Sequence, residues 1–235
     1  MYKHLIVSGC SFTKWAYKTW PDYLADALGC KLTNLAHPGS GNYYIRRSII
    51  DHLRQTEPDP SDTLIMIQWS GITRRDVEVS EDFVNLYSGL NTMKLINGSY
   101  FAISGGMDGR WQYNHATKTY FEWLYKLTDN KTHWANTLDN LLTAKEFLNK
   151  HRYRYYFLSY TNNFTTDEDW SVEEPSAKGC CPTYEKHSIL DDSWIQEDLY
   201  SFAKAKEHGF STDNYHPNTL THEQFLKEVV LPRLQ

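Results

Sequence analysis

The stretch TLIMIQW, residues 63–69, constrains the fold of this chain more than any other feature, because it is apolar at almost every position. A strand with one face in water alternates polar and apolar residues, whereas a strand covered on both faces is apolar nearly throughout. The stretch therefore predicts a strand of a parallel sheet that has helices packed on both of its faces.

The residues before this strand supply the elements that such a sheet needs. Residues 3–7 and 31–35 predict two further strands. Trp20–Leu28 predicts a helix, with a proline at its start and a glycine after its end, and residues 42–55 carry apolar side chains at helical spacing. This βαβαβ order implies parallel strands joined by right-handed crossovers, so we expect an α/β fold with a mostly parallel sheet.

The region from about residue 77 to 117 does not follow this alternation. Asn97-Gly98 lies in a stretch typical of a hairpin with its turn at these two residues. We therefore expect a small β insertion at about 77–117. With 235 residues in all, the chain is expected to form one domain, residues 1–235.

The alternation resumes after the expected insertion. An amphipathic pattern around residues 134–148 predicts a long helix, and residues 153–160 predict a fourth strand of the sheet. Residues 161–193 show no clear period and are assigned to a long ordered loop. A last helix is expected from Thr221 to about Val230, ahead of Pro232.

Charge and cysteine content exclude several classes of protein. A net charge of −5 argues against a general nucleic-acid binder, which needs clustered Lys and Arg. The N-terminal apolar run is too short for a signal peptide or a membrane span, so we expect a cytoplasmic chain without a membrane partner. The four cysteines form no disulfide framework, and Cys180, Cys181 and His187 lack zinc-site spacing, so neither metal nor organic cofactor is expected.

Candidate reactive residues follow the predicted strands. In open α/β sheets ligands bind beyond the carboxyl ends of the strands, where this chain has Ser11, Gly39 and Ser70. A serine hydroxyl needs a base to act as a nucleophile. The segment DNYHPN offers His216 as that base, with Asp213 three residues earlier to hold the imidazole in one tautomer.

Three short segments resemble blocks of the SGNH hydrolases, also called GDSL esterases and lipases: SGCSFT, NLAHPGSGN and DNYHP. The resemblance implies a three-layer α/β/α sandwich with a flavodoxin-like sheet. It also implies that Ser11 is the nucleophile, that His216 and Asp213 complete a triad, and that Gly39 contributes to the oxyanion hole together with the Ser11 backbone.

The chain departs from the family pattern at two positions. Cys10 stands where the family usually has an aspartate outside the triad. The third block normally supplies an asparagine to the oxyanion hole, whereas IQWSG offers Ser70, and Asn42 is the other candidate for this role. Loss of one oxyanion donor typically costs about 100- to 1000-fold in rate.

Each catalytic candidate also has a structural interpretation. Ser11 and Gly39 are common turn residues, His216 is compatible with a purely structural role, and Asp213 with a helix cap. Cys10 is an alternative nucleophile, although neighbouring residues of an extended segment point in opposite directions.

Three further residues are candidates for substrate binding. Trp69 is suited to stacking on a sugar or acyl group, Arg74 to contacting an acidic group, and His37 adjoins the loop of the oxyanion glycine. Their structural alternatives are core packing for Trp69, a solvated surface position for Arg74 and an ordinary polar position for His37.

The resemblance leads us to expect a serine ester hydrolase that acts through an acyl-enzyme on small acyl esters. The high content of aromatic residues, 15%, favours O-acetylated carbohydrate as one substrate class. Two alternatives stay open: an acyltransferase with the same triad, and a weakly active or inactive glycan-binding or structural module.

Overall fold

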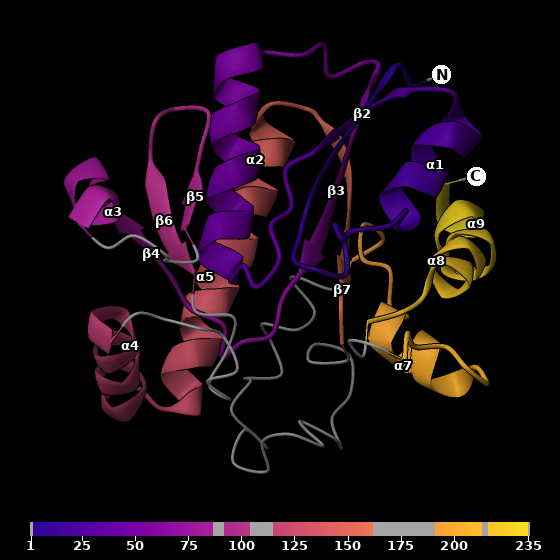
Figure 1. Ribbon diagram of the computed structural model, residues 1–235. Coiled ribbons are helices and arrows are strands. Elements are labelled where there is room, and N and C mark those ends of the chain that lie inside the picture. The colour runs from indigo at the N-terminus through magenta and orange to yellow at the C-terminus, as the bar shows by residue number, and fades with distance from the viewer. Residues whose placement is uncertain (1, 87–91, 104–114, 162–190, 213–215, 235) are drawn as a thin grey trace.

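The central sheet of the computed structural model, which describes residues 2–86, 92–103, 115–161, 191–212 and 216–234, has four parallel strands (Figure 1). In chain order these strands are β1 (His4–Ser8), β2 (Lys31–Asn34), β3 (Thr63–Trp69) and β7 (Arg154–Ser159). They lie side by side in the order β2-β1-β3-β7, and all three pairings are parallel. The expected α/β fold with a parallel sheet is confirmed.

Strand β3 has the predicted bounds, and all seven of its residues are buried. Alternate side chains of the sheet enter two separate cores, so that Ile65 and Ile67 lie in one and Leu64 and Met66 in the other. A strand whose alternate side chains pack in two different cores must be apolar at successive positions, which accounts for the composition of β3. Each large apolar side chain buried in this way contributes about 1.5–3 kcal/mol to folding.

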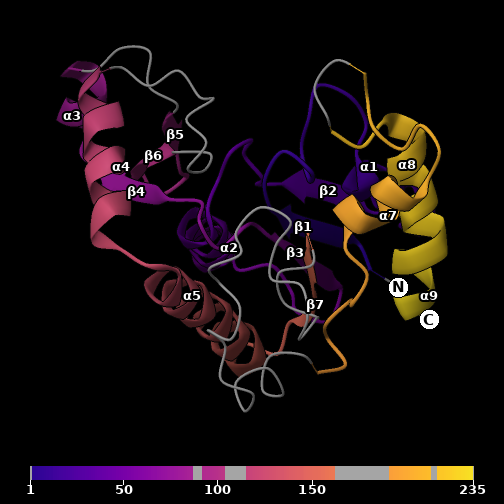
Figure 2. The same cartoon turned by 90° about the horizontal axis from the view of Figure 1, so that it is seen from below.

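Helices cover both faces of the sheet (Figures 1 and 2). One face is covered by α2 (Asn42–Thr56) and α5 (Asn130–Lys150). The other is covered by α1 (Trp20–Leu28), α7 (Leu199–Ala205), α8 (Thr219–Phe225) and the π-helical turn η2 (Leu226–Val230), which continues into α9 (Leu231–Leu234). The molecule is thus a three-layer sandwich.

Helix α1 shows how closely local sequence signals can set the ends of a helix. Thr19 and Asp22 form a capping box at its start, and Pro21 lies in its first turn. Gly29 follows its last residue with φ of 63°, a left-handed conformation that favours glycine. The observed bounds, Trp20–Leu28, are the predicted ones.

A second, antiparallel sheet lies beside the first, in the order β4 (Asp76–Val79), β6 (Tyr100–Ile103), β5 (Thr92–Lys94). The predicted hairpin is confirmed, because β5 and β6 pair antiparallel and the Gly98 amide donates to the Leu95 carbonyl between them. Two helices, α3 (Glu81–Leu86) and α4 (His115–Leu127), lie near this sheet (Figures 1 and 2).

Some expected elements differ from the observed ones. The last helix was expected from Thr221 to Val230, but α8 begins at Thr219 after its cap Asn218, and the helical path continues past Pro232. The proline is accommodated because it follows the π-helical turn directly, near the start of α9. Most of the expected loop at 161–193, with Cys180, Cys181 and His187, lies outside the described residues.

Candidate active site

Ser11 lies in a tight turn directly after β1, at the carboxyl edge of the sheet. The amides of Thr13 and Lys14 both donate to the Cys10 carbonyl, which closes the turn. Ser11 is 3% exposed, and no described residue forms a hydrogen bond with its hydroxyl. Cys10 is fully buried and packs in the core that α1 and α8 cover.

Buried hydrogen bonds fix this turn to the sheet. Thr13 Oγ1 donates to Gln68 Oε1 of β3 at 2.6 Å. The Thr13 carbonyl accepts from Asn34 Nδ2 at 2.9 Å and from Thr19 Oγ1 at 2.7 Å. The position of Ser11 is therefore set by contacts with β2, β3 and the start of α1.

Gly39 lies in the loop that connects β2 to α2, with φ of 82°. The His37 amide and Ser40 Oγ both donate to the Gly9 carbonyl, at 3.2 Å and 2.8 Å, so this loop is fastened to the strand end that precedes Ser11. Neither the Ser11 amide nor the Gly39 amide donates to any residue within the described ranges. Both amides are suited to binding an oxyanion.

Asn42, the first residue of α2, binds both backbone groups of Ser70. Asn42 Oδ1 accepts from the Ser70 amide at 2.8 Å, and Asn42 Nδ2 donates to the Ser70 carbonyl at 3.2 Å and to Thr137 Oγ1 at 3.3 Å. Both amide hydrogens of Asn42 are thus engaged, whereas Ser70 Oγ is buried without a partner in the described part of the chain. Of the two candidates for the third oxyanion donor, this geometry favours Ser70.

Asp76, which the sequence analysis did not single out, holds the start of α2 from the other side. Asp76 Oδ2 accepts from the Tyr44 amide at 2.5 Å. Burial raises the pKa of this carboxyl to about 7, although the amides of Tyr44 and Gly41 and the nearby charge of Arg75 act in the opposite direction. A Cβ on Gly41 would overlap Asp76 Oδ1, so the carboxylate lies directly against the helix start.

The structure brings His216 to the turn that carries Ser11. Its ring stacks on Trp15, with ring centroids 4.0 Å apart and an angle of 17° between the planes. The ring also lies beside Phe12, with ring centroids 5.4 Å apart. The His216 carbonyl accepts from the Ser211 amide, and Tyr17 Oη donates to the next carbonyl, that of Pro217. No hydrogen bond joins Ser11 to His216, and Asp213 lies outside the described residues.

A second histidine lies behind His216. His222 is buried in α8, and its Nδ1 accepts from the Trp20 amide at 3.3 Å. Burial, with a smaller contribution from His216, lowers the pKa of His222 to about 3. His222 is therefore neutral at pH 7 and serves the packing of α1 on α8.

The three predicted substrate-binding residues have different surroundings. Trp69 is fully buried and meets Phe157 edge to face, so it cannot form a stacking surface for a ligand, and this expectation is corrected. The Arg74 guanidinium lies over the Tyr160 ring, with Cζ 4.8 Å from the ring centroid. Tyr160 in turn packs edge to face on Phe12.

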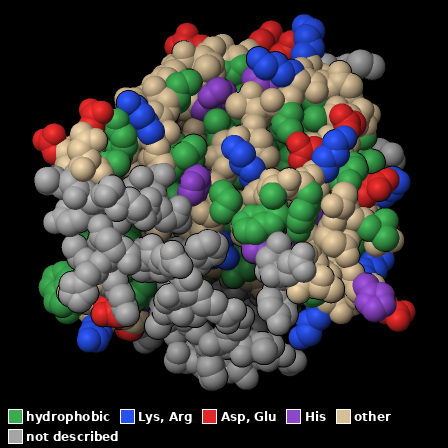
Figure 3. Space-filling view, viewed as in Figure 1, with side chains coloured by type: hydrophobic (Ala, Val, Ile, Leu, Met, Phe, Trp, Pro, Cys, Tyr) green, Lys and Arg blue, Asp and Glu red, His purple; other side chains and the backbone are tan. Residues whose placement is uncertain are grey.

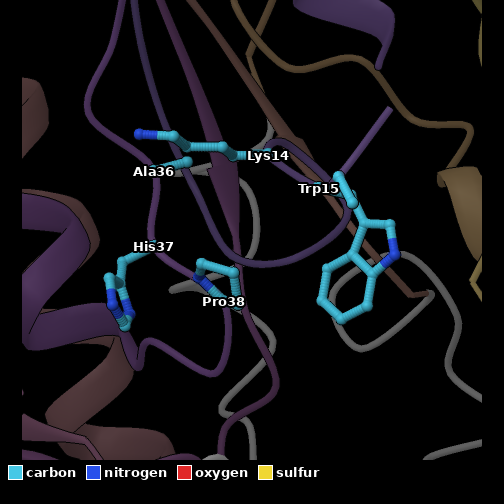
Figure 4. A pocket seen from close by; sticks show the side chains of 6 residues that line it. Lys14, Trp15, Ala36, His37 and Pro38 are labelled. Atoms are coloured by element: carbon cyan, nitrogen blue, oxygen red, sulfur yellow. The ribbon is translucent and has the colours of Figure 1, made fainter. Parts of the chain in front are cut away.

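His37 lines a pocket of about 310 Å³ between the turn after β1 and the loop after β2. The lining residues, several of which Figure 4 labels, are Lys14, Trp15, Ala16, Ala36, His37 and Pro38. Figure 4 shows Pro38 between His37 and the Trp15 ring, and the Lys14 side chain extending across Ala36 away from Trp15. Trp15, rather than Trp69, is the tryptophan that adjoins the candidate catalytic residues.

Among the described residues, no group of three or more His, Cys, Asp or Glu side chains is placed to hold a metal ion. No helix there combines the length and apolarity that crossing a bilayer requires.

Comparisons with known proteins bear on the fold. Residues 13–233 match DUF6071, described as a family of unknown function. No curated protein matches the chain in sequence.

Solved structures resemble it over nearly its whole length. The crystal structure of TesA has a TM-score of 0.55 at 11% identity, covering 99% of this chain and 98% of the other. The psychrotrophic esterase EstA from Pseudoalteromonas sp., inhibited by monoethylphosphonate, has a TM-score of 0.51 at 12% identity, with coverage of 99% and 98%.

A putative lipolytic protein of the G-D-S-L family from Desulfitobacterium hafniense DCB-2 has a TM-score of 0.52 at 9% identity and covers 96% of each chain. At such identities these likenesses show a common fold. The chain thus has the fold of the G-D-S-L lipolytic proteins, as the short sequence blocks suggested.

Proposed function

The chain belongs to DUF6071, a family of unknown function, and from its fold and the residues at the carboxyl edge of its sheet we propose that it is a serine ester hydrolase. One observation carries this proposal. The ring of His216, from the far end of the chain, packs on Trp15 and Phe12 of the turn that holds Ser11.

In the proposed reaction, Ser11 Oγ attacks the carbonyl carbon of an ester while His216 takes the hydroxyl proton. Collapse of the tetrahedral intermediate releases the alcohol, which receives that proton from His216, and leaves an acyl group on Ser11. Water, activated by His216, then frees the acid. Asp213 is proposed to hold the imidazole and to stabilise its protonated form.

The oxyanion that forms during each attack is proposed to bind the amides of Ser11 and Gly39 and the hydroxyl of Ser70. The two amides donate to no other described residue, and Ser70 Oγ is buried without a partner in the same part of the chain, which supports this assignment. Donors fixed before the reaction stabilise a developing charge without reorganising. Under this proposal, the shorter side chain of Ser70 takes the place of the missing asparagine of the family pattern.

The proposed substrates are small acyl esters, among them O-acetylated carbohydrates. Trp15 is half-buried at the site and offers the aromatic surface for which Trp69 is too deep. Arg74, stacked on Tyr160 near Phe12, is proposed to lie within reach of an acidic group of the substrate.

The proposal is tested by turnover of 4-nitrophenyl acetate and by labelling with a fluorophosphonate. We expect Ser11→Ala to lose labelling and His216→Ala to lose at least about a thousandfold in kcat/KM, because nucleophile and base act as one unit. The matched controls are Ser61→Ala and His208→Ala, both at exposed positions, which should retain wild-type turnover.

Full turnover by Ser11→Ala would overturn the mechanism. Transfer of acetyl to an added sugar that outruns hydrolysis would identify an acyltransferase with the same triad. Glycan binding by a wild type that neither labels nor turns over ester would instead identify a binding module.

A further inference from the structure

Of the residues that line the pocket beside the candidate catalytic residues, the reaction described so far uses Trp15 alone, as an aromatic surface for the substrate. The pocket is built from two short segments: one, Lys14 to Ala16, follows Ser11 in the turn after β1, and the other, Ala36 to Pro38, precedes Gly39. An ester carbonyl held between Ser11 and Gly39 would therefore have this pocket as its immediate neighbour. Its volume of about 310 Å³ suits a small group, at the low end of ligand pockets.

The lining of the pocket combines apolar surface with basic side chains. Trp15, Ala16, Ala36 and Pro38 form the apolar part. Lys14 and His37 are the ionisable residues of the lining, and none of the described residues adds an acidic side chain to it. On a chain whose net charge is −5, this basic character of the described lining differs from the average surface.

The two basic side chains, His37 and Lys14, differ in charge and in burial. His37 is neutral at pH 7, because burial lowers its pKa and the charge of Lys14 lowers it further, and its Nδ1 is buried without a partner in the described part of the chain. Lys14 is exposed and carries the positive charge. Figure 3 shows histidine and hydrophobic side chains near the middle of the face seen in Figure 1, with a lysine or arginine among them and acidic side chains farther to the right.

We propose that this pocket selects an ester that carries a negatively charged group, such as a carboxylate, on a small apolar body. The apolar body lies against Trp15 and Pro38, and the anionic group pairs with the Lys14 ammonium. The inference rests on the proposed ester hydrolysis and specifies its substrate class. It differs from the assignment of Arg74, whose guanidinium lies over Tyr160 and is not part of this pocket.

Two pairs of esters test the proposal and locate the charge. Mono-4-nitrophenyl succinate is compared with 4-nitrophenyl butyrate, which places the charge in the acyl part. 4-Acetoxybenzoate is compared with its methyl ester, which places the charge in the alcohol part. For each pair the measured quantity is the ratio of kcat/KM for the charged ester to kcat/KM for the neutral one.

We expect Lys14→Gln to lower this ratio about three- to fivefold in at least one pair, the effect of removing one exposed ion pair. Lys14→Glu should lower it about tenfold, because attraction is replaced by repulsion. Lys150→Gln, an exposed lysine at the end of α5, is the matched control and should leave both ratios unchanged. Because Lys14 is itself exposed, its variants should fold, which circular dichroism checks.

The outcomes separate the inference from the proposed function. If the wild type turns over the neutral esters and Lys14→Glu leaves both ratios unchanged, the charge preference is overturned and ester hydrolysis stands. If the wild type turns over none of the four esters, both are overturned. A ratio that falls in only one pair supports the inference and identifies the part of the ester that occupies the pocket.

Discussion

The two halves of the candidate site differ in the interactions seen among their described residues. The oxyanion half, residues 35–44 and 70–76, contains buried hydrogen bonds in which Ser40 and Asn42 donate and in which Asn42 and Asp76 accept. In the histidine half, residues 210–212 and 216–217, the ring of His216 stacks on Trp15, and main-chain carbonyls accept from Tyr17 and from the Ser211 amide. The comparison predicts that the oxyanion half is preorganised and that the aromatic ring beside His216 helps to orient its imidazole.

Asn42→Ala should have the largest effect on stability and rate, because it removes the hydrogen bonds that join the start of α2 to Ser70 within the oxyanion half. The substitution leaves the buried backbone groups of Ser70 without partners, so we expect the free energy of unfolding to fall by about 3 kcal/mol. The kcat for 4-nitrophenyl acetate should fall about a hundredfold as Gly39 and Ser70 lose their spacing. Chemical denaturation and steady-state kinetics measure these changes, with exposed Asn149→Ala as the control.

Ser70→Ala should separate rate from stability within the same half. The Ser70 hydroxyl is buried and unpartnered among the described residues, so its removal should keep or slightly raise the melting temperature. If this hydroxyl binds the oxyanion, kcat should nevertheless fall about ten- to a hundredfold. An unchanged kcat in Ser70→Ala would remove Ser70 from the oxyanion hole, while Ser61→Ala should alter neither quantity.

Trp15→Ala tests the histidine half. Loss of the ring stacked on His216 should lower kcat/KM about tenfold and shift the pH profile of kcat/KM, whereas Trp15→Phe should restore most of the activity. Trp123→Ala on α4 is the matched control, since that ring is 58% exposed. A Trp15→Ala variant with the wild-type pH profile would show that the stacking does not orient the base.

Asp76→Asn should have the smallest effect on activity and a distinct effect on stability. The pKa of Asp76 rises from 3.8 to about 7 on folding, so between these pH values the folded state binds more protons and stability falls as pH rises. The variant should lose this dependence and gain about 2–3 kcal/mol relative to the wild type between pH 5 and pH 8. Urea denaturation at pH 5 and pH 8 measures this change in the free energy of unfolding. Asp139→Asn, at an exposed position, should show the same pH dependence of stability as the wild type.

The sequence predicted the elements whose signals are local. The helix Trp20–Leu28 carries its own start and stop residues, and β3 must be apolar because it faces two cores. Helix α4 was missed because Tyr120, Trp123 and Leu127 point outward, so apolar residues do not mark a buried face. The last helix was ended too early because nothing in the sequence signals the π-helical turn before Pro232.

The site was predictable to a smaller extent. Ser11, Gly39 and His216 come from segments that the structure brings to one edge of the sheet, and their catalytic roles stay predictions. Trp69 was misassigned because a residue at a strand end can still point into the core. The contact of Asp76 with the start of α2 depends on tertiary packing between distant segments, which spacing along the chain does not encode.

The close approach of Asp76 to Gly41 also bears on how this part of the chain can change over evolution. Gly29 has open space around it, and only its left-handed backbone restricts it, so asparagine is an acceptable replacement there. At position 41 a methyl group already collides with a carboxylate oxygen and with the Arg74 carbonyl. In a library of all single variants, position 41 should therefore accept glycine alone, and a smaller residue at position 76 should not restore other residues at 41, because the contact with the Arg74 backbone remains.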